Sequence, residues 1–557
     1  MRGAARPAGL LVVLLVLAGC VSPPSAGPIR EGMEGPVPEA PEPLVRAIAN
    51  PPQPGMDPLE VVAGFLSAAA AAGDDFAVAR QYLAPQAAAD WNPGAGVTIA
   101  ASDVPRLTPK SGAVAIEFLR VGVVSASGVL VDESPAASAL EVPVAQLDGQ
   151  WRITGPPPGL LLSRQQVARA FAVRNAYFVD PSSRWAVPDV RLVPLTGTQA
   201  QATALVTALL AGPSQWLADS VVTSIPVGLQ LALGAVPVSD GVARIQLTGP
   251  QATLDEAAAA RFGAQFAWTL RQVSQVEAFT VSIDGVQVPL GGRRGPILLE
   301  EYASFDPDVL GDTVPLYGLS PQGVPVRVDG DEAVVLPGVD GAATQFAAVA
   351  VAPAGSLIAG AAADRTGLLI GSVDGPLQQH RIEVPIASGP SIDGRERVWW
   401  TDPAGQAWVA SATPEGSFAA LPVAGAPGPI TLIRPARDGT RVVVVLGGES
   451  YLAAVVADDT GPQLQGFRRL IDIGGVGDVA WHAADRLTVL APRTKVVQRI
   501  DLLGGSTGAF AVPALTKGLT DAPGAPVVLE LSDGTAGRLT GSGVRVVERL
   551  AAPTYPG

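Results

Sequence analysis

The stretch Ala436-Arg437-Asp438-Gly439-Thr440, followed by the apolar run from Val442 to Leu446, decides the fold that we predict for the carboxyl-terminal part of this chain. Aspartate followed by glycine favours a tight turn, because glycine takes positive φ angles without strain and the aspartate side chain caps nearby backbone. A run of valine and leucine favours a buried β-strand. The stretch therefore predicts a turn that leads directly into a strand.

Four similar turns occur elsewhere in this part of the chain: Ala352 to Leu357, Ser391 to Arg395, His482 to Arg486 and Leu531 to Thr535. Each of the first three also precedes an apolar run. Gly355, Gly394 and Gly439 are spaced by 39 and 45 residues, and Gly534 follows about two periods later. A period of about 40 to 50 residues with several strands is typical of a β-propeller. We therefore predict an all-β, propeller-like domain at residues 297–557, with room for about six repeats. No Trp-Asp dipeptide recurs, so blade number and ring closure stay open.

The amino-terminal residues have the order of a secretory signal. Arg2 and Arg6 precede an uncharged apolar run from Ala8 to Leu17, which small residues follow. The segment Leu17-Ala18-Gly19-Cys20 resembles a bacterial lipobox. The resemblance implies a signal peptide at residues 1–19, and a mature chain that begins at Cys20 with N-palmitoyl and S-diacylglycerol groups. It also implies a protein anchored by lipid to the extracytoplasmic face of the cell membrane.

An ordinary secretory signal or a short anchor helix is the alternative. An apolar run of about ten residues is too short to cross ~30 Å of hydrocarbon, which favours the lipobox interpretation over an anchor helix. Residues 20–56 are rich in proline and glycine, so we expect an extended tether there.

Residues 57–160 predict an α+β domain. Asp57-Pro58 marks a helix start, and we expect Asp74 to cap a second helix. Alternating apolar residues such as Val114, Ile116 and Phe118 then indicate strands. The order of elements resembles the NTF2-like fold, whose cavity sometimes holds small ligands. A plain spacer domain is the other interpretation.

Residues 161–296 predict a second α+β domain. We expect a linking helix around Gln165 to Val173, then strands and helices in alternation. Phe262, Phe266 and Leu270 share one face of the last helix. The stretches Tyr177 to Asp180, Leu209 to Ser214 and Trp268 to Val273 resemble a GerMN module. Phe266 and Trp268 are candidates for a binding platform or for core packing, and the second interpretation is the simpler one.

Composition and motifs favour a protein without catalytic or metal chemistry. The net charge of −14 disfavours nucleic acid as a partner, and we expect no cofactor and no metal site. Gly504 to Gly508 matches the hydrolase elbow and Gly475 to Ala480 a dinucleotide loop, but both lie among predicted strands. The histidines His380 and His482 lack neighbours at metal-ligand spacing, and the carboxylate pairs Asp74-Asp75 and Glu300-Glu301 suit solvated or capping roles.

Lipobox, tether, α+β domain, GerMN-like module and propeller-like repeats occur together in the LpqB lipoproteins of Actinobacteria, which this chain resembles over its length. The resemblance implies a non-enzymatic accessory of the MtrAB two-component system, with the extracytoplasmic domain of an MtrB-like sensor histidine kinase as partner. An envelope binding module for a peptidoglycan fragment, a cell-wall glycan or a peptide is the alternative function. Of the site residues, only Cys20 and its lipobox are carried over.

Overall fold

The computed structural model describes residues 49–557 except 72–75, 196, 251–253, 309, 311–312, 331, 338, 340–344, 413–417, 459–460, 472–474 and 541–542. Cys20, the lipobox residues Leu17, Ala18 and Gly19, the tether up to residue 48 and the predicted cap Asp74 lie outside this part. The described residues belong to one compact unit, Arg46–Gly557. Among the described helices, none is long and apolar enough to cross a membrane.

The first domain begins with the helix that Asp57-Pro58 predicts. Helix α2 spans Pro58–Ala70, and Asp57 and Glu60 form a capping box in which each side chain accepts the other residue's backbone N–H, at 2.9 Å and 2.8 Å. Short helices α3 (Ala77–Arg80) and α4 (Pro85–Asp90) follow. Trp91 closes this layer, since its ring meets that of Phe65 edge-on at 5.1 Å between centroids.

These helices cover a six-stranded sheet of order β5-β4-β3-β1-β6, with β2 also paired to β3. The strands are β1 (Gly96–Ala100), β2 (Arg106–Lys110), β3 (Ala113–Ser125), β4 (Leu130–Leu147), β5 (Gln150–Ile153) and β6 (Leu160–Ser163). Helix α5 (Arg164–Ala170) leads out of the domain. This helix ends earlier than predicted, because Phe171 to Val173 pair with Leu192 to Pro194 as the start of the next strand.

The second domain starts with the antiparallel pair β7 (Phe171–Val179) and β8 (Ala186–Pro194). It adds α6 (Thr198–Leu210), α7 (Glu256–Leu270) and a sheet of β9 (Gln230–Leu231), β10 (Val238–Ser239), β11 (Val242–Thr248), β12 (Ala278–Ile283), β13 (Val286–Gln287) and β14 (Ile297–Leu298). Helix α7 connects the parallel strands β11 and β12 and buries the face that carries Phe262 and Phe266. The short η4 (Leu299–Phe305) leads towards the repeats.

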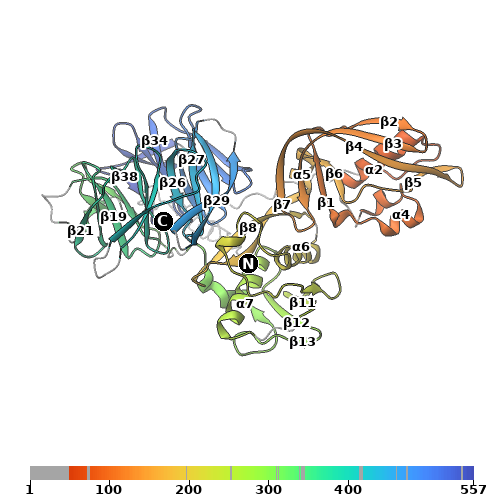
Figure 1. Cartoon of the computed structure of the whole chain (residues 1–557), viewed down its shortest axis with the longest axis horizontal. Coiled ribbons are helices and arrows are strands. Elements are labelled where there is room, and N and C mark those ends of the chain that lie inside the picture. Colours follow the sequence, from red (N-terminus) through yellow and green to blue (C-terminus); the bar gives the residue numbers. More distant parts are fainter. Residues whose placement is uncertain are drawn as a thin grey trace, which may run out of the picture. The chain divides into compact units, whose positions relative to one another are not determined.

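The repeats form six four-stranded antiparallel sheets in the described part of the chain (Figure 1). We call these sheets blades 1 to 6. Blade 1 is β15 (Leu316–Leu319), β16 (Pro325–Asp329), β17 (Glu332–Val335) and β38 (Ala551–Thr554); blade 2 is β18 (Phe346–Val351), β19 (Leu357–Ala362), β20 (Gly367–Ser372) and β21 (Leu377–Arg381); blade 3 is β22 (Ser388–Ile392), β23 (Arg397–Thr401), β24 (Ala407–Ala412) and β25 (Phe418–Pro422).

The remaining blades repeat the pattern. Blade 4 is β26 (Ile430–Pro435), β27 (Arg441–Leu446), β28 (Glu449–Asp458) and β29 (Gly461–Ile471); blade 5 is β30 (Asp478–Ala483), β31 (Arg486–Ala491), β32 (Val496–Asp501) and β33 (Ser506–Ala511); blade 6 is β34 (Thr516–Thr520), β35 (Val528–Leu531), β36 (Ala536–Thr540) and β37 (Gly543–Val547). The predicted fold class is confirmed: two α+β domains precede an all-β propeller.

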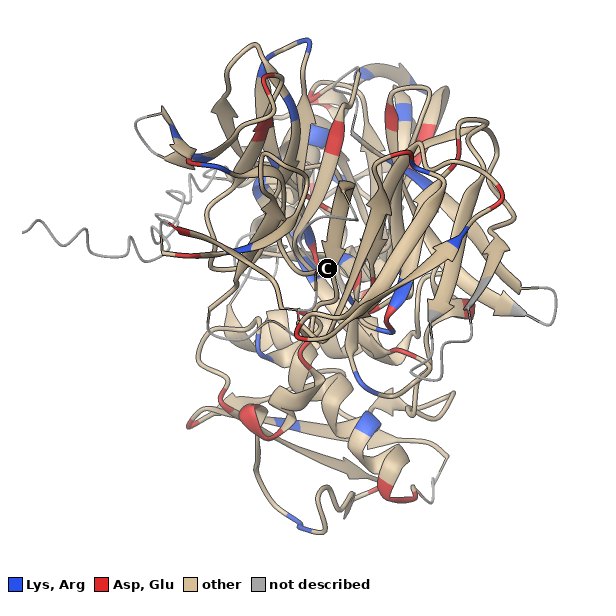
Figure 2. Ribbon diagram, turned by 90° about the vertical axis from the view of Figure 1, so that its left-hand side faces the viewer, with Lys and Arg blue, Asp and Glu red and all other residues tan. Residues whose placement is uncertain are grey.

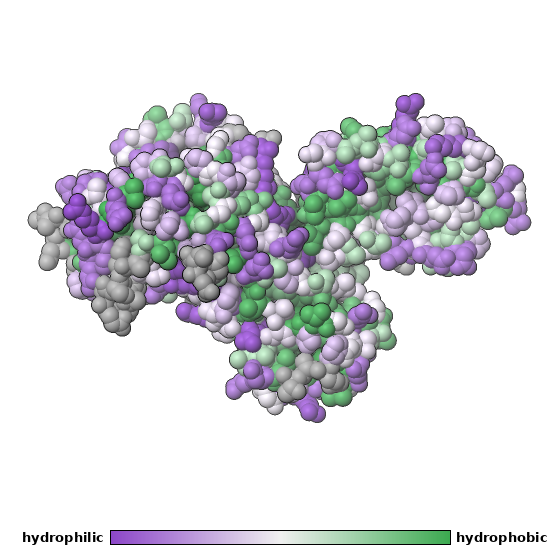
Figure 3. Space-filling model, in the orientation of Figure 1, coloured by the Kyte–Doolittle hydropathy of each residue, from purple (hydrophilic) through white to green (hydrophobic). Residues whose placement is uncertain are grey.

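The ring is closed by its last strand. Strand β38 pairs with β15 of blade 1, so the first and last parts of the repeat region share one sheet. Closure leaves no blade with a missing innermost strand. Hydrophilic residues cover much of the surface in the view of Figure 3, and acidic and basic residues are interspersed over the blades in Figure 2.

Candidate functional site

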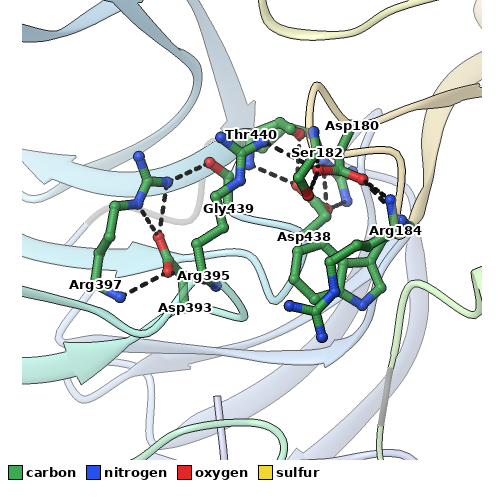
Figure 4. Close-up of polar contacts among 11 residues, drawn as sticks. Asp180, Ser182, Arg184, Asp393, Arg395, Arg397, Asp438, Gly439 and Thr440 are labelled. Atoms are coloured by element: carbon green, nitrogen blue, oxygen red, sulfur yellow. Dashed lines mark hydrogen bonds and ion pairs between the residues drawn. The ribbon is translucent and has the colours of Figure 1, made fainter. Parts of the chain in front are cut away.

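The loop between β7 and β8 is built around the carboxylate of Asp180. Its Oδ1 accepts the backbone N–H groups of Arg184 and Trp185 at 2.7 Å and 2.8 Å, and its Oδ2 accepts that of Ser182 at 2.8 Å. The Asp180 side chain is fully buried. A further contact comes from the propeller, because Nη2 of Arg395 lies 3.3 Å from Oδ2 (Figure 4). This cation, 215 residues away in sequence, offsets the charge of a buried carboxylate.

The turn that follows β22 in blade 3 uses an aspartate in the same way. Oδ1 of Asp393 accepts the backbone N–H groups of Arg395 and Arg397 at 2.9 Å and 3.0 Å, and Oδ2 binds the side chains of Arg397 and Trp399. Arg397 also donates to the carbonyl of Gly439 in the next blade at 2.5 Å (Figure 4). The predicted turn role of this aspartate is therefore confirmed, and its side chain also links two blades.

Asp438 repeats the arrangement in blade 4, where all partners are buried. It pairs with Arg441 and accepts the backbone N–H of Thr440 at 2.8 Å. Burial by itself would raise the pKa of Asp438, but the charge of Arg441 and the hydrogen bonds from Arg441 and Thr440 outweigh it and hold the pKa below its usual value. Arg441 also donates to the carbonyl of Pro188 in β8 at 3.4 Å, so this pair reaches the second domain.

Further contacts complete a junction between the second domain and blades 3 to 5. Asn175 donates from Nδ2 to the carboxylate of Asp485 at 2.8 Å. Val190 of β8 packs into an apolar cluster of propeller residues that includes Val443 and Val479. A side chain at Gly394 would lie 3.1 Å from the ring of Trp185, so the absence of a Cβ lets the two domains approach. The junction thus combines apolar packing with ion pairs that compensate the buried carboxylates of Asp180 and Asp438.

A second buried charge cluster lies on β8 and has a local signal in the sequence. Asp189 and Arg191 interrupt the apolar run of β8, and both side chains are completely buried at an ion-pair distance of 2.8 Å. Ser214, at the end of the stretch that resembles a GerMN module, binds both: its Oγ lies 2.7 Å from Nη1 of Arg191 and 2.8 Å from Oδ1 of Asp189. The cluster joins β8 to the segment after α6, and sequence reasoning missed it.

A cavity of about 230 Å³ lies at the centre of the propeller, lined by the innermost strands of all six blades. Arg434 and Asp478 form an ion pair of 3.0 Å across neighbouring innermost strands. Arg434 also donates to Oγ of Ser391 at 3.2 Å, and Asp478 accepts the backbone N–H of Leu519 at 3.0 Å. These contacts connect blades 3, 4, 5 and 6 around the cavity.

Two aromatic residues and two carboxylates that the sequence singled out have contacts that stabilise the fold. Phe266 is fully buried, and the buried Trp268 donates from Nε1 to the carbonyl of Tyr302 at 2.9 Å, so both belong to the core. Glu301 accepts the backbone N–H of Leu298 at 3.0 Å as a cap, and Glu300 pairs with Arg271 at 3.3 Å.

The two candidate glycine motifs lie among strands, as predicted. Gly504 to Gly508 spans the turn into β33, and β30 rather than a helix follows Gly475 to Gly477. His380 lies on β21, whereas Nδ1 of His482 lies 3.2 Å from the carboxylate of Asp521. That carboxylate also binds Thr488 and Arg499, so it connects strands of blades 5 and 6.

Three family models match the chain in succession. They describe the N-terminal domain of lipoprotein LpqB at residues 51–168, a sporulation and spore germination domain (Germane) at residues 175–289, and the β-propeller domain of lipoprotein LpqB at residues 323–532. Solved propellers give low scores: the β-propeller domain of Swd1 from Myceliophthora thermophila covers 39% of this chain and 90% of that chain, with 12% identity and a TM-score of 0.32.

Curated relatives match nearly end to end. Lipoprotein LpqB of Thermobifida fusca is 28% identical over 98% of this chain and 97% of its own length. The LpqB lipoproteins of Mycobacterium paratuberculosis and Mycobacterium tuberculosis are each 29% identical and cover 86% of this chain, and 86% and 85% of their own lengths. With both LpqB domain models and a Germane domain between them, the chain belongs to the LpqB family of actinobacterial lipoproteins.

Proposed function

We propose that this protein is a non-enzymatic accessory of a two-component sensor kinase of the MtrAB type, and that it acts in cell-envelope and division signalling. It would be held by lipid at the extracytoplasmic face of the cell membrane and contact the extracytoplasmic domain of an MtrB-like histidine kinase. The observation that carries the proposal is the junction between the Germane domain and the propeller. Domains of one chain move relative to each other by default unless their interface is large and well packed.

The junction supports a role in interaction because it presents two domains as one body. The buried carboxylates of Asp180 and Asp438 each have a cation beside them, and the contacts of Arg395 and Arg441 cross the domain boundary. Breaking such buried pairs is costly, so the two surfaces keep a fixed geometry. A fixed geometry lets a protein without chemistry of its own bias the state of a bound partner, provided that it binds the two states differently.

The anchor and the tether support the same role. Three acyl chains at Cys20 would hold the mature protein at the membrane, since each buried methylene contributes about 0.8 kcal/mol. Of the predicted tether 20–56, the last residues pack against the first domain, where the hydroxyl of Tyr82 donates to the carbonyl of Asn50 at 2.8 Å. The proline-rich residues 20–48, at ~3.1 Å per residue, would reach on the order of 90 Å. That reach is enough for the folded domains to meet the outer part of a neighbouring membrane protein.

Crosslinking in native membranes tests the proposal. The full-length protein with its own anchor is crosslinked, and the captured partners are identified. Capture of a sensor histidine kinase is the expected result, and loss of the kinase on deleting residues 297–557 would assign the contact to the propeller.

The matched variants are Arg441→Ala, which breaks the junction, and Arg469→Ala, which removes an exposed arginine of the same blade. We expect the first to weaken capture and the second to leave it unchanged. Capture of cell-wall glycan without any kinase, together with unchanged kinase phosphorylation in a deletion strain, would contradict the proposal and favour an envelope binding module.

A further inference from the structure

The propeller cavity is closed at one end by the chain itself. The turns that follow the innermost strands face the Germane domain, as the contacts of Arg395 and Asp485 show. At that end, Arg437 donates to the carbonyls of Trp481 at 3.1 Å and Pro556 at 3.4 Å, and Gly557 donates to Val351 at 2.9 Å. These bonds link blades 1, 2, 4 and 5 across the axis. The cavity therefore has its mouth at the amino ends of the innermost strands.

The two walls of the cavity differ in chemistry. Most of the small residues of the lining come from blades 1 to 3, which contribute one charged side chain, Arg365, whereas blades 4 to 6 contribute Arg434, Asp478, Asp521 and Glu530 among uncharged neighbours. The small residues are Ala348, Ala350, Ala387, Ser388, Gly389 and Ala552. On the opposite side, Arg434 pairs with Asp478 at 3.0 Å and Glu530 with Lys517 at 2.8 Å. A ligand that fits both walls has small apolar groups on one side and polar groups on the other.

Arg365 is the charged residue of the mouth that pairs with no carboxylate in the described part of the chain. It lies in the β19–β20 loop and lines the cavity. Its Nη1 donates to the carbonyls of Ile386 and Ala387 at 3.3 Å and 3.4 Å, which orients the guanidinium without neutralising it. A guanidinium has five N–H donors in a planar fork that matches a carboxylate. The remaining donors of Arg365 therefore suit an anionic group that enters from the mouth.

The backbone of the cavity wall adds amide groups. Strands β18, β22, β26, β30 and β34 each stand at one end of their sheet, and no described strand pairs with the edge that faces the axis. Such an edge offers peptide N–H and C=O groups to an extended ligand. A ligand that carries amides of its own would use this edge.

We propose that the propeller cavity binds the carboxyl end of a short peptide or N-acyl amino acid with small side chains. In this site, Arg365 pairs with the terminal carboxylate, the alanine-rich wall accepts methyl-sized side chains, and the unpaired strand edges bind the peptide groups. The site does not depend on a contact with a kinase, because both of its walls belong to the propeller.

Isothermal titration calorimetry on the purified full-length protein tests the site with N-acetyl-alanyl-alanine as the probe. We expect one molecule to bind per chain, and the C-terminal amide of the same dipeptide to bind about tenfold more weakly, equivalent to about 1.4 kcal/mol. Arg365→Gln should weaken binding of the acid by a similar factor and bind acid and amide equally. Arg381→Gln, on the outer strand β21 of the same blade, is the matched control and should bind like the wild type.

A second variant keeps the test independent of the charge. Ser388→Phe at the half-buried mouth should block binding of acid and amide alike while circular dichroism stays unchanged. The proposal is overturned if the wild type binds neither peptide up to about 10 mM, if acid and amide bind equally, or if Arg365→Gln binds like the wild type. Competition by acetate as potent as the dipeptide would reveal a simple anion site and overturn the assignment to peptides.

Discussion

Nη1 of Arg437 lies 3.3 Å from the carboxylate of Asp308, which joins the turn after β26 to the segment between η4 and the propeller. Arg437 is buried, whereas the Asp308 side chain keeps 25% of its exposure. Burial raises the pKa of Asp308 to about 6, although the charge of Arg437 opposes the shift. The carboxyl of Asp308 therefore has a pKa of about 6 in the folded protein.

This pair predicts a pH dependence of stability. Between the unfolded pKa of 3.8 and the folded pKa of about 6, the folded state binds the proton more tightly, so its contribution to stability is present at low pH and lost as the pH rises through 6. Relative to Asp308→Asn, the wild type should lose about 1–2 kcal/mol of unfolding free energy from pH 4.5 to 7, a value reduced for the partial exposure of the carboxylate. Urea titrations at several pH values measure this difference. A difference that stays constant with pH would contradict the assignment.

The buried pair of Asp438 and Arg441 gives a second prediction. Arg441→Ala leaves a buried carboxylate uncompensated and should cost about 3–5 kcal/mol of unfolding free energy. Arg469→Ala breaks an exposed pair with Glu449 in the same blade and should cost less than about 1 kcal/mol. Denaturant titration of both variants checks the contrast. Equal losses of unfolding free energy would show that burial does not make the Asp438–Arg441 pair more important than the exposed pair.

Gly394 predicts how closely the domains must approach. A Cβ at this position would overlap the carbonyl oxygen of Arg437 and crowd the ring of Trp185, so Gly394→Ala should destabilise the protein by about 1–3 kcal/mol. Gly428→Ala is the matched control, because nothing lies within 4 Å of its Cβ position. Thermal unfolding distinguishes the two variants. Equal unfolding midpoints for the two variants would mean that the backbone around position 394 shifts to accommodate the added Cβ.

Because β38 closes the ring, we expect the free energy of unfolding to fall more as a larger part of the carboxyl-terminal segment is removed. Tyr555→Phe removes the hydrogen bond from the hydroxyl to the carbonyl of Pro526 and should cost about 1 kcal/mol. Deletion of residues 551–557 removes the whole innermost strand of blade 1, exposes the edge of β15 and should cost several times more. Calorimetry of both proteins tests this order. Similar unfolding temperatures for the deletion and the wild type would show that the ring does not need the strand.

Cys20 predicts how the protein is anchored. The mature protein should fractionate with membranes and carry acyl mass on Cys20, and Cys20→Ala should release it, because three buried acyl chains make dissociation slow. Membrane fractionation and mass spectrometry of the amino terminus give the answer. An unmodified native amino terminus, with Cys20→Ala still bound to membranes, would rule out the lipid anchor.

Local sequence was sufficient for the turns, many of the strands and the start of α2. The aspartate-glycine turns and the strands β23 and β27 lie where their residues predict, because φ preferences and runs of β-branched residues act over a few positions. The helix predicted to reach Val173 ends at Ala170, since pairing with β8 overrides helix propensity there. Local sequence also fails to predict burial: Asp438 and Asp533 have similar neighbours in sequence, yet Asp438 is buried and Asp533 is exposed.

Periodicity, turn chemistry and short motifs were enough to predict the class and order of the domains and the family. The folded structure was needed to show that the described strands complete six blades, where the repeat spacing predicts about six, that β38 closes the first of them, and that Arg395 reaches Asp180 across 215 residues. These features depend on how much surface the assembled sheets bury and on which distant charges are buried together. Such terms are absent from any short stretch of chain, so no local pattern records them.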